Sequence, residues 1–151
     1  MQNAQDVARY LLVTQDPNGE RITNLKLQKL VYFAQGFYLG WRGRPLFSES
    51  IKAWAHGPVV PALWHEYRQY GSNPLPLPTS PPSGFTSDER AVLDSVTRAY
   101  GGYSAWDLRE ITHREPPWVE AFNRPGGPGA IAHSALEAQY KGRVQAPTEG
   151  G

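Results

Sequence analysis

The chain has no cysteine, and this absence removes several kinds of site at once. Without a thiol there is no disulfide framework, no thiolate zinc site and no cysteine nucleophile. An excess of one charge is also missing, because 15 Lys and Arg face 14 Asp and Glu for a net charge of +1. Surfaces that bind nucleic acid by releasing counterions are usually strongly basic. We therefore do not expect nucleic acid among the partners of this domain.

Long uninterrupted apolar runs are missing as well. The longest apolar stretch, residues 25–41, is broken by four polar residues and cannot span a bilayer: Lys26, Gln28, Lys29 and Gln35. The N-terminus has no basic segment followed by an apolar one, so we expect no signal peptide, no membrane contact and a cytoplasmic location. The chain has 151 residues, of which 40% are hydrophobic and 12% aromatic. This composition is typical of a packed domain.

Apolar residues recur with a helical period along most of the chain. The predicted fold class is all-α, a compact single domain of about six to seven helices with at most a short β-hairpin near residues 46–55. The predicted helices span residues 6–15, 24–41, 61–70, 87–100, 104–112, 116–123 and 134–141. Proline-rich residues 71–85 are predicted to form a semi-rigid loop. We expect one domain over residues 1–141 and a flexible C-terminal tail over residues 142–151.

The second predicted helix has the clearest pattern. Its apolar positions follow the i, i+3, i+4 rule over four turns: Leu27, Leu30, Val31, Ala34, Phe37, Tyr38 and Trp41. A second apolar stripe has seven-residue spacing: Leu25, Tyr32 and Leu39. Two stripes predict a central helix that packs on more than one side. Gly36 and Gly40 each weaken a helix by about 1 kcal/mol relative to Ala. The sequence therefore predicts that another segment approaches the helix closely at Gly36.

Residues that would support catalysis are not arranged in any recognised pattern. The four histidines lack metalloprotease spacing and have no adjoining carboxylate cluster: His56, His65, His113 and His133. No serine lies in a nucleophile elbow, and no glycine-rich loop ends in Lys-Ser or Lys-Thr. We therefore expect a binding protein rather than an enzyme, with no cofactor and no metal.

Three separated segments carry recognisable motifs. Residues 23–36 read Thr-Asn-Leu-Lys-Leu-Gln-Lys-Leu-Val-Tyr-Phe-Ala-Gln-Gly, and residues 54–61 read Trp-Ala-His-Gly-Pro-Val-Val-Pro. The third segment, residues 112–118, reads Thr-His-Arg-Glu-Pro-Pro-Trp. In this order the three motifs resemble the Panacea-domain family, which includes SocA-like antitoxins and phage-associated GepA-like proteins. The resemblance covers residues 3–141, and the proline loop at 74–82 departs from the family pattern.

The resemblance implies a function in a bacterial toxin–antitoxin system. Such a protein is an α-helical antitoxin that binds a cognate protein toxin encoded by a neighbouring gene and neutralises it directly. For the SocA-like branch, the resemblance also implies an adaptor that hands the toxin to a ClpXP-type protease. Some members carry an extra N-terminal DNA-binding domain, which we do not expect here because the chain starts at the first family helix. The alternative function is a phage-associated regulator that binds DNA, and a hydrolase with a titrating histidine pair is a third.

Two groups of residues are candidates for contact with the partner. Aromatic and histidine side chains beside proline-bearing connectors form the first group, because a stiffened segment loses little entropy when a partner docks. Two lysines at the start of the second helix form the other, as a small positive edge for an acidic toxin. The predicted partner-binding residues are Trp54, His56, His113 and Trp118 in the first group, and Lys26 and Lys29 in the second.

Overall fold

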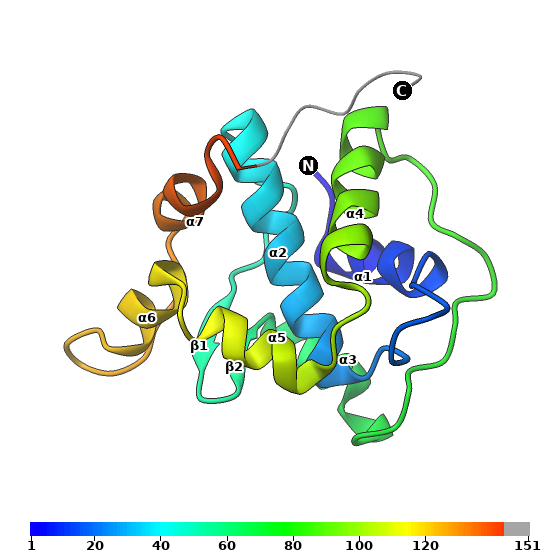
Figure 1. The fold of residues 1–151 in the computed structure, drawn as a ribbon, viewed down its shortest axis with the longest axis horizontal. Coiled ribbons are helices and arrows are strands. Elements are labelled where there is room, and N and C mark those ends of the chain that lie inside the picture. Colours follow the sequence, from blue (N-terminus) through cyan, green and yellow to red (C-terminus); the bar gives the residue numbers. More distant parts are fainter. Residues whose placement is uncertain (144–151) are drawn as a thin grey trace.

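The computed structural model describes residues 1–143 and arranges the helices of this part of the chain around α2 (Figure 1). The helices are α1 (Ala4–Val13), α2 (Asn24–Arg42), α3 (Pro61–Tyr67), α4 (Ser87–Tyr100), α5 (Ala105–Thr112), α6 (Pro116–Phe122) and α7 (His133–Tyr140). A 3-10 turn, η1 (Arg68–Tyr70), follows α3. The predicted all-α single domain is confirmed. Residues 144–151 of the predicted tail lie outside the described residues.

Helix α2 runs through the middle of the molecule. In Figure 1, α1 and α4 lie on one side of α2 and α7 on the other, with α5 and the small hairpin near its N-terminal end. Every residue of α2 is buried except Leu25, Gly40, Trp41 and Arg42. The helix is therefore packed on more than one side, as the sequence predicted, although Leu25 and Trp41 of the two stripes are only partly buried. The central position of this helix is confirmed.

Local signals in the sequence set most helix ends. The Thr23 side chain accepts a hydrogen bond from Lys26 N at the start of α2, and Gly43 ends that helix in the left-handed region at φ 72°. Thr86 and Glu89 form a complete capping box on α4. Helix α1 differs from the predicted range of 6–15, because Asn3 caps it and the helix begins at Ala4.

The hairpin lies further along the chain than predicted. Strand β1 (Lys52–Trp54) pairs antiparallel with β2 (Gly57–Val59), so the hairpin spans 52–59 and not 46–55. Gly57, at φ 124°, follows Ala55 and His56 and allows the tight turn that these two residues form. The segment before β1 is held instead by the buried Gln35 side chain, whose Oε1 accepts from Leu46 N at 2.7 Å. That long-range hydrogen bond leaves no periodic trace in the sequence.

Helices α2 and α7 cross at the two glycines. A Cβ added to Gly36 would lie 2.6 Å from Cδ2 of the Tyr140 ring, and one added to Gly40 would lie 2.5 Å from the backbone carbonyl carbon of Tyr140. The predicted close approach at Gly36 is confirmed, with a side chain as the neighbour there. The backbone itself approaches at Gly40. Both glycines therefore allow α7 to lie directly on α2.

Gly40→Ala and Gly36→Ala are both expected to lower the free energy of unfolding by about 1–3 kcal/mol, with the larger loss at Gly40. Backbone cannot move aside as a side chain can, and this sets the order. Gly102→Ala is a matched control, because its Cβ would meet only Asp16 Oδ2 at 3.8 Å. Chemical denaturation of the three variants tests the prediction. If Gly36→Ala and Gly40→Ala stabilised the protein, helix propensity and not a close crossing would explain these positions.

Candidate functional site

Three of the predicted partner-binding residues meet where the hairpin packs on the turn between α5 and α6, and a fourth, His56, lies in the hairpin turn next to them in sequence. The Trp118 indole Nε1 donates a hydrogen bond to the backbone oxygen of Trp54 at 3.0 Å. The His113 ring stacks on the Trp118 ring with centroids 4.0 Å apart. His56 lies in the turn between the two strands, two residues after Trp54. The second and third sequence motifs are therefore in direct contact.

These four side chains are not equally available to a partner. Trp118 is 7% exposed and belongs to the core. Trp54 is half-buried, with its ring edge against Trp64 at 5.9 Å, and His56 is exposed. His113 is half-buried, and its Nε2 is enclosed without a hydrogen-bond partner among residues 1–143. Burial and then the charge of Arg109 lower the pKa of His113 below its ordinary value.

Lys26 does not contribute to a positive edge, and that part of the expectation is wrong. Its side chain is 1% exposed. The ammonium Nζ donates to the backbone oxygens of Glu20 at 2.6 Å and Gly101 at 2.8 Å. Burial lowers the pKa of Lys26, an effect opposed by the carboxylates of Glu20 and Asp16. Lys26 thus ties two loops to α2.

Lys29 is also buried, at 2% exposure, so it does not form an exposed positive edge either. Its Nζ donates to the oxygen of Leu25, one turn back in the same helix, at 3.1 Å. Gly57 lies against the end of this side chain, since a Cβ added there would be 3.2 Å from Lys29 Cε. Burial and then the neighbouring Arg109 lower the pKa of Lys29 to about 8. The turn of the hairpin thus covers a cation.

A pocket of about 310 Å³ opens beside Lys29. Residues from α2, the hairpin turn and α5 line it: Leu25, Lys29, His56, Ala105, Trp106 and Arg109. Trp106 is 64% exposed, and the Arg109 guanidinium carbon lies 4.8 Å from its ring centroid. Arg109 also contacts the carboxylate of the adjacent Glu110 at 3.6 Å. We call these six residues the Lys29 pocket. It joins buried positive charge to an exposed aromatic surface.

Trp106 was not among the predicted site residues, although the sequence contains a signal for it. Leu108 and Thr112 are the buried residues of α5. Trp106 comes two residues before Leu108, which places it roughly 200° around the helix from the core-facing side. A wheel drawn for this short helix would have placed the tryptophan on the solvent side. Large exposed aromatic residues are common anchors in protein interfaces.

Glu115 is a second residue that sequence reasoning missed. Its carboxylate oxygen Oε1 accepts hydrogen bonds from the Tyr32 hydroxyl at 2.8 Å and the Tyr140 hydroxyl at 2.6 Å. Burial raises the pKa of Glu115, and the two tyrosine hydroxyls partly oppose that rise. One carboxylate therefore links α2, the turn before α6, and α7. It is buried and holds these three segments together, and it is not exposed to a partner.

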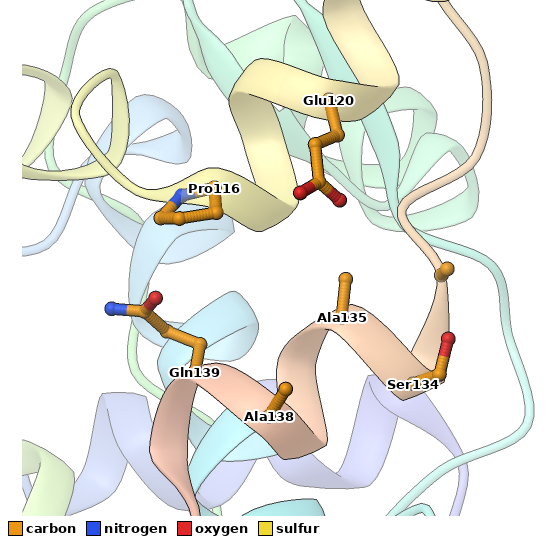
Figure 2. A pocket seen from close by; sticks show the side chains of 7 residues that line it. Pro116, Glu120, Ser134, Ala135, Ala138 and Gln139 are labelled. Carbon is orange, nitrogen blue, oxygen red and sulfur yellow. The ribbon is translucent and has the colours of Figure 1, made fainter.

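A larger hollow, of about 440 Å³, lies between α6 and α7. Figure 2 shows Glu120 projecting from α6 into this space and Ala135 and Ala138 facing it from α7, with Gln139 at the rim. The residues that line it are mostly small, and its one charged group is the exposed Glu120. Nothing in this hollow holds a charge in a buried position, so we take the Lys29 pocket as the candidate site.

Over residues 1–143, no group of three or more His, Asp or Glu side chains has an arrangement that could hold a metal ion. Within the same residues, each helix is too short or too polar to cross a membrane.

The fold and the site together define an all-α single-domain protein with a cationic, partly aromatic surface pocket. The family model described as "Antitoxin SocA-like, Panacea domain" matches residues 27–119. The chain is also 32% identical over 138 residues to Antitoxin SocA of Caulobacter vibrioides (strain NA1000 / CB15N), covering 82% of this chain and 72% of that protein. No solved structure gives a significant match. The chain belongs to the SocA-like Panacea-domain antitoxin family.

The matched region contains the elements that build the site. Residues 27–119 include most of α2, the whole hairpin, α5, and Trp118 on α6. The resemblance inferred from the three motifs is therefore confirmed. In the structure, Gln28 Oε1 accepts from Val60 N at 2.8 Å, which ties the first motif to the second. Tyr32 and Glu115 tie the first to the third. These motif residues hold the segments around the pocket in place.

Proposed function

We propose that this protein is an antitoxin that neutralises a protein toxin, encoded by a neighbouring gene, by binding it directly in the cytoplasm. The observation that carries the proposal is the family match together with 32% identity to a protein named Antitoxin SocA over 82% of the chain. The site geometry supports a binding role, since the Lys29 pocket offers an exposed tryptophan, a buried lysine and a partly exposed arginine. In this proposal the protein acts by binding and not by catalysis.

The binding face that we propose is centred on the Lys29 pocket and the hairpin turn. Lys29, His56 and Trp54 belong to this face, with Trp106 and Arg109 added from α5. His113 and Trp118 support it from beneath, because His113 stacks on a tryptophan that is itself buried. Lys26 is not part of this face, because its ammonium binds the loop carbonyls of Glu20 and Gly101, where it stabilises the fold.

Co-expression tests the proposed function. The gene beside this one is placed under an inducible promoter, alone or together with this chain. We expect its product to stop growth alone, to be harmless in the presence of this chain, and to co-purify with it as a complex. A neighbour that is not toxic and does not bind this chain would contradict the proposal.

We further propose that neutralisation can proceed through a ClpXP-type protease, with this chain as the adaptor. The expected result is that the toxin is short-lived only when this chain and the protease are both present. The measurement is the half-life of the tagged toxin after synthesis is stopped, in cells with and without ClpX. An unchanged half-life alongside full rescue would mean that binding alone neutralises the toxin.

A further inference from the structure

Lys29 is a buried cation that has no counter-charge among residues 1–143. Its side chain is 2% exposed. The salt bridges formed by residues 1–143 pair other residues, so no carboxylate oxygen of this part of the chain lies within 4.0 Å of Lys29 Nζ. The single hydrogen bond of Nζ goes to the oxygen of Leu25, which lies one helical turn back. Burying a charge without a partner is costly, and natural proteins rarely retain such a group without a use for it.

The groups around Lys29 make that cost larger. Arg109 lowers the pKa of Lys29, and both Arg109 and Lys29 lower the pKa of His113. Lys29 and Arg109 therefore raise the local positive potential together, and the neighbouring His113 is kept neutral by its burial and by their charges. Glu110 is the acidic group paired with Arg109, at 3.6 Å and with both side chains partly exposed. With its pKa at about 8, Lys29 still carries its charge at neutral pH. An arriving anion would relieve this repulsion.

Much of the lining of the pocket is apolar. Leu25 and Ala105 contribute to it, together with Trp106, most of whose surface is exposed. A pocket of about 310 Å³ accommodates one amino-acid side chain and part of a neighbour. A ligand that fits both features has one negative group and an aliphatic or aromatic remainder.

We propose that the Lys29 pocket receives an acidic side chain of the toxin, whose carboxylate pairs with Lys29 and Arg109 while an adjoining apolar residue packs on Trp106. This inference rests on the proposed antitoxin function and names the recognition chemistry of its site. The pairing converts an unfavourable buried charge into an interfacial ion pair, so the free antitoxin is left with a charge that only the complex satisfies.

A carboxylate fits better than the phosphates of a nucleic acid. Nucleic acids present a row of charges and are bound by several cations along a surface. Here Asp107 and Glu110 interrupt any row of cations along α5, whereas a single carboxylate needs only the two cations that line the pocket, Lys29 and Arg109. The net charge of +1 points the same way.

The test compares Lys29→Met and Trp106→Ala with two controls. Arg68→Gln removes an exposed cation on η1, and Leu77→Ala removes an exposed apolar residue on the proline loop. Binding to the toxin is measured by calorimetry, and each variant is also melted. We expect Lys29→Met and Trp106→Ala each to weaken binding by at least about tenfold without lowering the melting temperature. Both controls should remain within about twofold of wild type.

A double-mutant cycle then identifies the toxin group. Each Asp and Glu of the toxin is replaced by its amide and measured against wild type and Lys29→Met. One replacement should be costly with wild type and nearly neutral with Lys29→Met, because the two groups act as a pair. Wild-type affinity in Lys29→Met would overturn the inference. So would loss of binding in Leu77→Ala with none in Trp106→Ala, which would place the binding surface on the proline loop.

The pocket can also be tested without a toxin, so that failure of the proposed function remains distinguishable. The isolated protein is titrated with N-acetylglutamate N-methylamide and, separately, with inorganic phosphate. The NMR signals of the Trp106 indole and the Lys29 ammonium are followed. We expect the carboxylate probe to shift both signals in wild type, and to leave Trp106 unshifted in Lys29→Met. A response to phosphate alone, or no response to the carboxylate probe, overturns the inference even if the toxin binds elsewhere.

Discussion

Glu115→Ala is expected to lower the free energy of unfolding by about 3–5 kcal/mol, the largest effect of a single substitution that we predict here. The substitution removes the acceptor of two buried hydroxyls, those of Tyr32 and Tyr140, and each unpaired buried donor costs about 1–3 kcal/mol. The lost packing adds to this. Because Tyr140 is the residue of α7 that lies on Gly36, the docking of that helix should loosen first.

Glu115→Gln is the matched control for this prediction. The amide oxygen can accept both hydroxyl hydrogen bonds, since both reach the same oxygen of Glu115 in the structure. We expect a change within about 1 kcal/mol. Urea denaturation at neutral pH measures both variants. If Glu115→Ala and Glu115→Gln were equally destabilised, the charge itself, and not its role as an acceptor, would be the important property.

The two variants should also differ in their pH dependence. Burial raises the pKa of Glu115 in the folded protein. A carboxyl whose pKa is raised on folding contributes stability below its unfolded pKa of about 4.3, and this contribution is lost as the pH rises through the folded value. Wild type should therefore lose stability relative to Glu115→Gln as the pH rises through that window. Parallel curves for the two proteins would contradict the raised pKa.

Lys26→Met and Lys29→Met are expected to change stability in opposite directions. Lys26→Met should lower the free energy of unfolding by about 2–4 kcal/mol, because its ammonium makes two hydrogen bonds to loop carbonyls, at Glu20 and Gly101. Lys29→Met should raise it by about 1–3 kcal/mol, because an apolar side chain of similar size replaces a buried charge without a counter-ion. The carbonyl that Lys29 contacts lies one turn back in its own helix.

The effect of Lys29 should depend on pH in a defined way. Its pKa of about 8 in the folded protein lies below the ordinary value of about 10.4. A lysine of this kind contributes stability above the unfolded pKa, and the contribution is lost as the pH falls through the folded value. The advantage of Lys29→Met should thus be largest at pH 7 and shrink as the pH rises above 8. Destabilisation of Lys29→Met at pH 7 would contradict the prediction and assign Lys29 a structural role.

The sequence could not distinguish the roles of these two lysines, because the neighbours that set their roles are distant in the chain. Both lie in the first two turns of α2, three residues apart, and both belong to the same motif. Lys26 reaches a carbonyl 75 positions further along the chain, at Gly101. Lys29 is covered by the hairpin turn and by α5. Neither neighbour can be identified from the spacing of residues within the helix.

The displaced hairpin has a related cause. Residues 46–55 were predicted as extended because they lack a helical period, and that part of the reasoning was correct. One tertiary contact and one local conformation decide where pairing occurs: Gln35 holds Leu46 and Phe47, while the positive φ of Gly57 allows the turn directly after Trp54. In a sequence, glycine followed by proline usually indicates a turn. Residues 57–59 were therefore predicted as a connector, although they form strand β2.

The sequence by itself determined the order of the helices, the all-α class and the family. These depend on local signals, such as the capping box at Thr86, the apolar stripes of α2 and three motifs in a fixed order. Only the tertiary structure decided which polar residues join distant segments by hydrogen bonds and which charged residue lines a pocket. The physical reason is that the energy of a hydrogen bond or a buried charge depends on distances in space, and Glu115 meets Tyr32 across 83 positions of the chain.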